Sequence, residues 1–90
     1  MKREIMDMTT AQLKEFLTQG REVELSYRGH PYFIAPVFVN NVFSNEYYIY
    51  DNLAQNVVFT GCLHDVLAYE FSSNVSFEKT IEAFDFEYIL

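Results

Sequence analysis

Two short runs of alternating apolar and polar residues, on either side of a glycine, constrain the fold of this 90-residue chain more than any other feature. A period of two is typical of strands with one buried face. The pattern therefore predicts a β-hairpin over residues 22–36 with five apolar side chains on one face of a sheet. These side chains are Val23, Leu25, Tyr27, Tyr32 and Ile34.

The turn of this hairpin is expected within residues 28–31, which read Arg-Gly-His-Pro. A two-residue loop and a four-residue loop centred on the same point would both set Tyr27 opposite Tyr32. Pro31 has no amide hydrogen to donate to a ladder. The four-residue loop, closed by the two tyrosines, is therefore favoured.

A short helix is predicted at residues 10–19. Thr9 and Gln12 fit a capping box, in which the threonine hydroxyl reaches an amide three residues on and the glutamine reaches back. Apolar residues follow at helical spacing and form one stripe. Gly20 is well placed to end the helix, because glycine accepts the left-handed conformation common at helix ends.

The rest of the chain predicts an α+β fold, with 1–90 as a single small domain and 1–8 as a loosely ordered lead-in. Pro36 should end the second strand or mark an edge or a bulge. An antiparallel sheet of three or four strands is expected to pack with three short helices, largely on one face. The remaining elements are an extended segment 38–45 that passes through an asparagine turn, strands near 46–50 and 57–60, helices at 62–70 and 76–84, and a segment 85–90 that is either a further strand or a cover.

The order of these segments resembles a known group of proteins. A Leu-Lys-Glu-Phe-Leu helix precedes Gly-Arg-Glu-Val-Glu-Leu-Ser-Tyr-Arg-Gly-His-Pro-Tyr-Phe-Ile, followed by Tyr-Tyr-Ile-Tyr-Asp, a Ser-Phe-Glu-Lys helix and a Phe-Glu-Tyr-Ile-Leu tail. From Thr9 on, the chain is similar to small uncharacterised α+β proteins of low-GC Gram-positive bacteria and their mobile elements. That group has no assigned activity, so the resemblance implies no functional residue.

Charge is distributed unevenly along the chain. Residues 1–30 hold five basic and five acidic residues, whereas 31–90 hold Lys79 alone against eight acids, so the formal net charge of -7 arises there. Nucleic-acid binding draws much of its free energy from basic groups that neutralise phosphates. Anionic membrane leaflets repel an acidic surface as well. We therefore expect neither a nucleic-acid nor a membrane partner.

Cysteine and leader signals point to the cytoplasm. The single Cys62 cannot form an internal disulfide. Glu4 and Asp7 interrupt the residues after the basic start, so no apolar signal-peptide region is present. We expect a cytoplasmic protein.

No pattern of reactive side chains predicts an enzyme, a metal or a cofactor. Cys62 and His64 stand two residues apart at a predicted helix start, where side chains do not face each other. We expect a buried Cys62 and a surface His64, without zinc or nucleophilic chemistry. Asp85 and Glu87 alternate with aromatic residues, as on a solvated strand face, rather than forming a carboxylate pair across a cleft.

Sixteen aromatic residues are many for one small core. Aromatic side chains on a sheet can stack bases, but such platforms carry basic flanks that are missing here. Core packing accounts for most of them. If Tyr47 and Ile49 face inward, Phe33, Tyr48 and Tyr50 share the opposite side and form a candidate protein-interaction surface.

Three covers for that surface are open: the chain's own segment 85–90, which is favoured, a second copy, or an outside partner. The leading hypothesis is a small, non-catalytic, cytosolic protein-interaction module, with homodimerisation as one form of interaction. The alternative is an acidic protein that mimics nucleic acid and inhibits a DNA-binding protein. Mimicry needs carboxylates spaced along one exposed face.

Overall fold

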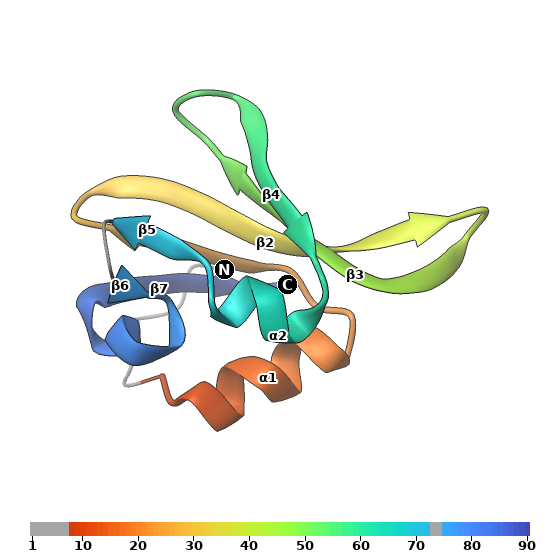
Figure 1. Cartoon of the computed structure of the whole chain (residues 1–90), viewed down its shortest axis with the longest axis horizontal. Coiled ribbons are helices and arrows are strands. Elements are labelled where there is room, and N and C mark those ends of the chain that lie inside the picture. Colours follow the sequence, from red (N-terminus) through yellow and green to blue (C-terminus); the bar gives the residue numbers. More distant parts are fainter. Residues whose placement is uncertain (1–7, 73–74) are drawn as a thin grey trace.

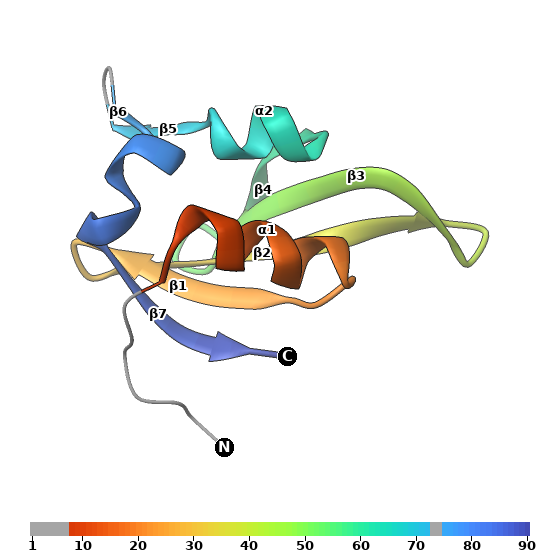
Figure 2. The ribbon, with the colours of Figure 1, turned by 90° about the horizontal axis from the view of Figure 1, so that it is seen from below.

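The structure, a computed structural model, describes residues 8–72 and 75–90. A twisted sheet is its main element, and the helical segments gather on one of the two faces of that sheet (Figure 1, Figure 2). In chain order the elements are helix α1 (Thr10–Thr18), strands β1 (Val23–Tyr27), β2 (His30–Val39), β3 (Val42–Asp51) and β4 (Asn56–Gly61), helix α2 (Leu63–Leu67), strands β5 (Glu70–Ser72) and β6 (Val75–Ser76), the 3-10 helix η1 (Glu78–Ala83) and strand β7 (Phe84–Ile89).

The α+β fold with an antiparallel sheet, predicted from the sequence, is confirmed. The sheet has five strands in the order β4-β3-β2-β1-β7, and β5 pairs with β6 in a separate two-stranded sheet. The predicted number of three or four strands was therefore too low. The C-terminal segment, for which both a strand and a cover were open, pairs antiparallel with β1 as β7.

Of the three predicted helices, only α1 matches closely. Thr9 and Gln12 form the predicted capping box. The helix predicted at 62–70 spans only Leu63–Leu67, and the chain extends into β5 at Glu70, where Phe71 packs against Tyr69 with ring centroids 4.8 Å apart. The helix predicted at 76–84 is a short 3-10 helix over Glu78–Ala83. The described chain thus contains two α-helices.

The register of the first hairpin differs by two residues from the predicted one. Tyr27 lies opposite His30, around a loop of Arg28 and Gly29 with φ angles of 52° and 80°. Positive φ at both positions is typical of the two-residue turns that suit the twist of strands. The carbonyl of Pro31 accepts from the Asn52 amide on the β3 side, so its missing amide costs no bond between β1 and β2. An error of two residues leaves every side chain on its predicted face.

Strands β2 and β3 form a hairpin, and both strands are longer than predicted. The predicted strand near 46–50 is only the second half of β3. The turn of the hairpin is Asn40-Asn41, within the segment 38–45 where an asparagine turn was expected, with φ angles of 52° and 64°. A register shift between Pro36 and Phe38 makes the proline a bulge position rather than a strand end. The end of this hairpin extends away from the helices (Figure 1). Phe38 there is 58% exposed.

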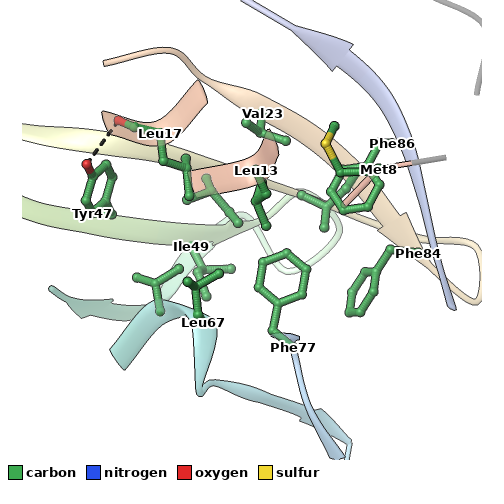
Figure 3. Close-up of a cluster of buried hydrophobic side chains, with 13 residues drawn as sticks. Met8, Leu13, Leu17, Val23, Tyr47, Ile49, Leu67, Phe77, Phe84 and Phe86 are labelled. Carbon is green, nitrogen blue, oxygen red and sulfur yellow. Dashed lines mark hydrogen bonds between the residues drawn. The ribbon is translucent and has the colours of Figure 1, made fainter. Parts of the chain in front are cut away.

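The core lies between the sheet and the helical layer. Leu13 and Leu17 of α1 are fully buried and join Ile34, Ile49 and Phe77 in one cluster (Figure 3). The hydroxyl of Tyr47 donates to the Leu17 carbonyl at 3.0 Å, which also satisfies an acceptor at the end of α1. The five hairpin residues predicted to share a face all belong to this cluster or pack against it.

Strand β7 contributes to the core rather than to the opposite face of the sheet. Phe84 and Phe86 are buried within the cluster, and the backbone of Leu25 pairs with Phe86. The segment 85–90 is therefore an edge strand and not the cover that we expected for Phe33 and its neighbours. Its alternation indicated a strand correctly but could not indicate which face of the sheet its rings would join.

The chain ends bear on two sequence expectations. The predicted lead-in 1–8 lies outside the described residues except for Met8, which is 6% exposed and belongs to the core. Within residues 8–72 and 75–90, no helix has the length and apolar character that crossing a membrane requires.

Candidate functional site

The face of the five-stranded sheet that points away from the helices is here called the outer face. Ile34 and Ile49 pair across β2 and β3 and are buried on the helix side. Because side chains alternate along a strand, Phe33, Tyr48 and Tyr50 point to the outer face. Figure 2 shows α1, α2 and η1 on one side of the sheet. None of the described helices crosses the outer face.

The structure brings the three candidate residues together. The rings of Phe33 and Tyr50 are stacked with centroids 4.9 Å apart, and Tyr48 meets Phe33 edge-on at 5.8 Å. All three side chains are half-buried. Ala35, opposite Tyr48, is 2% exposed. Phe33, Tyr48 and Tyr50, called the aromatic cluster below, thus form a packed surface rather than three separate side chains.

Strand β4 extends this surface toward one edge of the sheet. Val57 lies opposite Tyr50, and Thr60 lies opposite Tyr48. Val57 is 49% exposed. The outer face therefore continues from the aromatic cluster onto uncharged side chains of β4.

Carboxylates border the aromatic cluster on its other side. Glu24 of β1 lies opposite Phe33. Burial raises the pKa of Tyr48 above its ordinary value, and the negative charge of Glu22 raises it further. Glu87 of β7 accepts from the hydroxyl of Ser26 at 3.4 Å. Sequence reasoning missed this border because Glu87 reaches β1 from a distant part of the chain.

Basic side chains lie elsewhere in the described structure. None of the seven strands contains lysine or arginine. Arg21 lies over the ring of Phe16 at 5.1 Å, and Arg28 lies over the ring of Tyr27 at 5.4 Å. Both rings pack against the core cluster, so neither contact is on the outer face. The other described basic residues, Lys14 and Lys79, belong to α1 and η1.

Tyr27, Tyr32 and Tyr47 of the strands serve the fold. Tyr27 and Tyr32 both contact the ring of Phe71, at 6.3 and 4.9 Å. Burial raises the pKa of Tyr32 and of Tyr47, as expected for phenols packed beside a core. The predicted division of the tyrosines into core and surface groups is therefore visible in the structure.

Cys62 is exposed, contrary to the prediction that it is buried. The residue is the N-cap of α2, which begins at Leu63, so its side chain lies outside the helix and not on its inward face. His64 is on the surface, as predicted, and directs Nδ1 toward Asp65 at 3.4 Å rather than toward the thiol. An open hollow includes both residues and is lined by Thr18, Phe43, Asn45, Tyr47, Cys62, Leu63 and His64.

The sequence analysis did not predict the polar contact between His30 and Asp51. Nε2 of His30 lies 2.7 Å from Oδ1 of Asp51, and the same oxygen accepts from the amides of Leu53 and Ala54 at 2.9 Å. The Ala54 amide and then His30 hold the pKa of Asp51 below its usual value. The ring of Tyr32 stacks on His30 at 4.6 Å. This contact joins two turns and is structural.

No group of three or more metal-ligating side chains occurs in the part of the chain that the structure describes. No family model, no curated protein and no solved structure matches the chain. The function must therefore be argued from the outer face and its chemistry.

Proposed function

We propose that this protein is a small, cytosolic, non-catalytic protein-interaction module that binds a protein partner with its outer face. The observation that carries the proposal is the aromatic cluster on a sheet face that no described helix covers. Aromatic residues are enriched in the centres of protein interfaces. Packed aromatic anchors also supply much of the binding free energy in such interfaces.

The polar contacts support a binding role over a catalytic one. His30 and His64 each contact an aspartate, and Cys62 is the exposed N-cap of α2. Nucleophilic catalysis requires a base within hydrogen-bond reach of the nucleophile. In the described residues, the thiol and the imidazoles do not form such a pair.

The acidic-mimic alternative has weaker support. Mimicry of nucleic acid needs carboxylates repeated along one face, whereas the described acids are divided among helices, strands and connecting segments. Glu24 borders the aromatic cluster, Asp51 is engaged with His30, Asp65 lies on α2 and Glu78 on η1. We retain mimicry as an outcome to be tested rather than as a second proposal.

The proposed cytosolic location is supported by the single, unpaired Cys62. The resemblance to small proteins of low-GC Gram-positive bacteria and their mobile elements belongs to this proposal too. It fits a module that acts through a partner, since it implies no catalytic residue. A role as an accessory protein of a mobile element is the form of interaction that we propose from it.

The test compares two variants as bait in a lysate of the native host. Tyr48→Ala combined with Tyr50→Ala removes two of the three rings of the aromatic cluster. Phe38→Ala removes an exposed ring from the far end of the β2–β3 hairpin and serves as the matched control. We expect the double variant to lose the partner that wild type and the control retain. Thermal melting of each variant separates loss of binding from loss of fold.

Equal capture by the double variant, with an unchanged melting temperature, would contradict the proposal. Loss of capture by Phe38→Ala alone would move the interaction to the hairpin end. Competition of the captured partner by duplex DNA would favour the acidic-mimic alternative.

A further inference from the structure

The aromatic cluster and its carboxylate border form one two-part surface. Phe33 and Tyr50 present stacked rings on β2 and β3, and Glu24 lies directly opposite Phe33 on β1. Glu22 stands two residues before Glu24, and its negative charge contributes to the raised pKa of Tyr48. Aromatic rings and carboxylates therefore occupy neighbouring positions on the paired strands β1, β2 and β3.

Among the residues that the structure describes, the charges on this face are of one sign. All seven strands lack lysine and arginine. Among the described residues, neither Glu22 nor Glu24 forms an ion pair with a lysine or an arginine. Glu22 and Glu24 are thus not neutralised by a described lysine or arginine, and a cation from outside would find both their charge and the ring faces.

A guanidinium group suits such a surface better than other side chains. It stacks on aromatic rings and donates in a planar fork that matches a carboxylate. Cation–π contact and charge pairing add to each other when ring and carboxylate are neighbours. Lysine would bind mainly through its charge, because its ammonium is compact and strongly hydrated.

We infer that the outer face binds an arginine-bearing segment of its protein partner, with guanidinium groups over the aromatic cluster and paired with Glu22 and Glu24. This inference rests on the proposed function and specifies the chemistry of the partner. A second copy of the chain fits less well. In a two-fold contact each outer face would meet the same acidic border, and like charges in contact are unfavourable.

The test uses a blocked ten-residue peptide of alternating arginine and glycine as the probe, with the full chain. Matched peptides carry lysine or glutamate in place of arginine. Chemical-shift mapping is expected to place the arginine peptide on Phe33, Tyr48 and Tyr50. Isothermal titration should give weaker binding for the lysine peptide and none for the glutamate peptide. Added salt should weaken binding by the arginine peptide, because charge contributes to it.

A charge-matched pair of variants makes the test specific. Glu22→Gln with Glu24→Gln should raise the dissociation constant about tenfold, as expected for two contacts that together contribute about 1.4 kcal/mol. Glu15→Gln with Glu78→Gln changes the net charge equally but lies on α1 and η1. That control should change the constant by less than about twofold, since its charges are distant and screened.

Equal weakening by both pairs of variants would overturn the inference, because binding would then depend only on general acidity. Shifts confined to α2, β5 or η1 would overturn it as well. The proposed function has a separate failure. Capture of the host partner can depend on Tyr48 and Tyr50 and yet be unaffected by the Glu22 and Glu24 variants. In that case the proposed binding surface stands, and the inference of an arginine-bearing partner fails. If the tyrosines do not matter, both proposals fail.

Discussion

The imidazole of His30 lies 2.7 Å from the carboxylate of Asp51, and this contact joins the turn after β1 to the turn after β3. Asp51 also accepts from two amides of its own turn. A single carboxylate therefore fixes the turn that follows it and holds the neighbouring hairpin against it. The contact thus adds a side-chain link to the backbone pairing of β2 with β3.

Stability should depend on the ionisation of Asp51 at low pH. The hydrogen bonds from Ala54 and His30 hold the pKa of Asp51 in the folded state below the usual value for an aspartate. The carboxylate therefore contributes stability that is fully present above the unfolded pKa and is lost as the pH falls through the lower folded pKa. Asp51→Asn should be less stable at pH 7 and should lose less stability on acidification. Denaturant unfolding at several pH values measures both effects.

The control for this prediction is Asp85→Asn on β7, an exposed position. We expect it to change the free energy of unfolding by less than about 0.5 kcal/mol at pH 7. If Asp51→Asn kept the full acid dependence of wild type, the contact with His30 would not be a source of it.

Adjacent residues of β1 should differ strongly in their effect on stability. Leu25 is 2% exposed within the core cluster, so Leu25→Ala should lower the free energy of unfolding by about 2–5 kcal/mol through lost burial and a residual cavity. Glu24 points to the outer face, and Glu24→Ala should cost less than about 0.5 kcal/mol. Chemical denaturation of both variants is the measurement. The reverse order would mean that the strand is displaced by one residue.

The faces of the strands were predictable because a period of two is a property of the strand itself. Val23 and Ile34 were placed on the buried side before their partners were known, and an error of two residues in register did not move them. The register was not predictable from Pro31, because the cost of its missing amide depends on which neighbour it faces. In the structure it faces β3, which a local pattern cannot indicate.

The aromatic cluster was predictable for the same reason, since Phe33, Tyr48 and Tyr50 follow from the alternation on two strands. The residues that surround the aromatic cluster were not predictable from the sequence. Glu87 comes to lie beside Ser26 only because β7 pairs with β1, and the sequence left that segment open between a strand and a cover. The contact of His30 with Asp51 depends on two turns at once, and neither residue carries a signal of it.

Gly29→Ala should test the observed two-residue turn. Gly29 has a φ of +80°, and alanine would meet nothing within 4 Å there. The cost should therefore come from the left-handed backbone alone, at about 1–2 kcal/mol. Asn41→Gly, at a φ of 64° in the second hairpin, should stabilise slightly or not at all. Equilibrium unfolding of the two variants compares them. No loss for Gly29→Ala would contradict the turn.

Nucleic acid should not bind appreciably near physiological salt. The described basic residues lie on helices and turns, and two of them are held over aromatic rings. Few phosphate contacts can therefore form. A gel shift with random single-stranded and duplex oligonucleotides measures this, and sub-micromolar binding would overturn the interpretation of the charge distribution.

Deletion of residues 85–90 should abolish cooperative folding or cause aggregation, and the reason lies in the core. Phe86 is 3% exposed in the core cluster, and the backbone of β7 completes the sheet beside β1. The deletion would open a cavity and leave β1 as an unprotected edge, which favours association between strands. Sedimentation and thermal melting of the truncated chain measure the outcome.

Because the truncation removes a whole edge strand, Phe86→Ala gives a graded version of the same test. It retains the edge strand and should lower the free energy of unfolding by about 3–5 kcal/mol. Phe38→Ala, at a site 58% exposed, should have a much smaller effect and serves as the control. A truncated chain that stays monomeric and melts like wild type would show that β7 is dispensable. The core would then have to be complete without Phe86, contrary to its burial here.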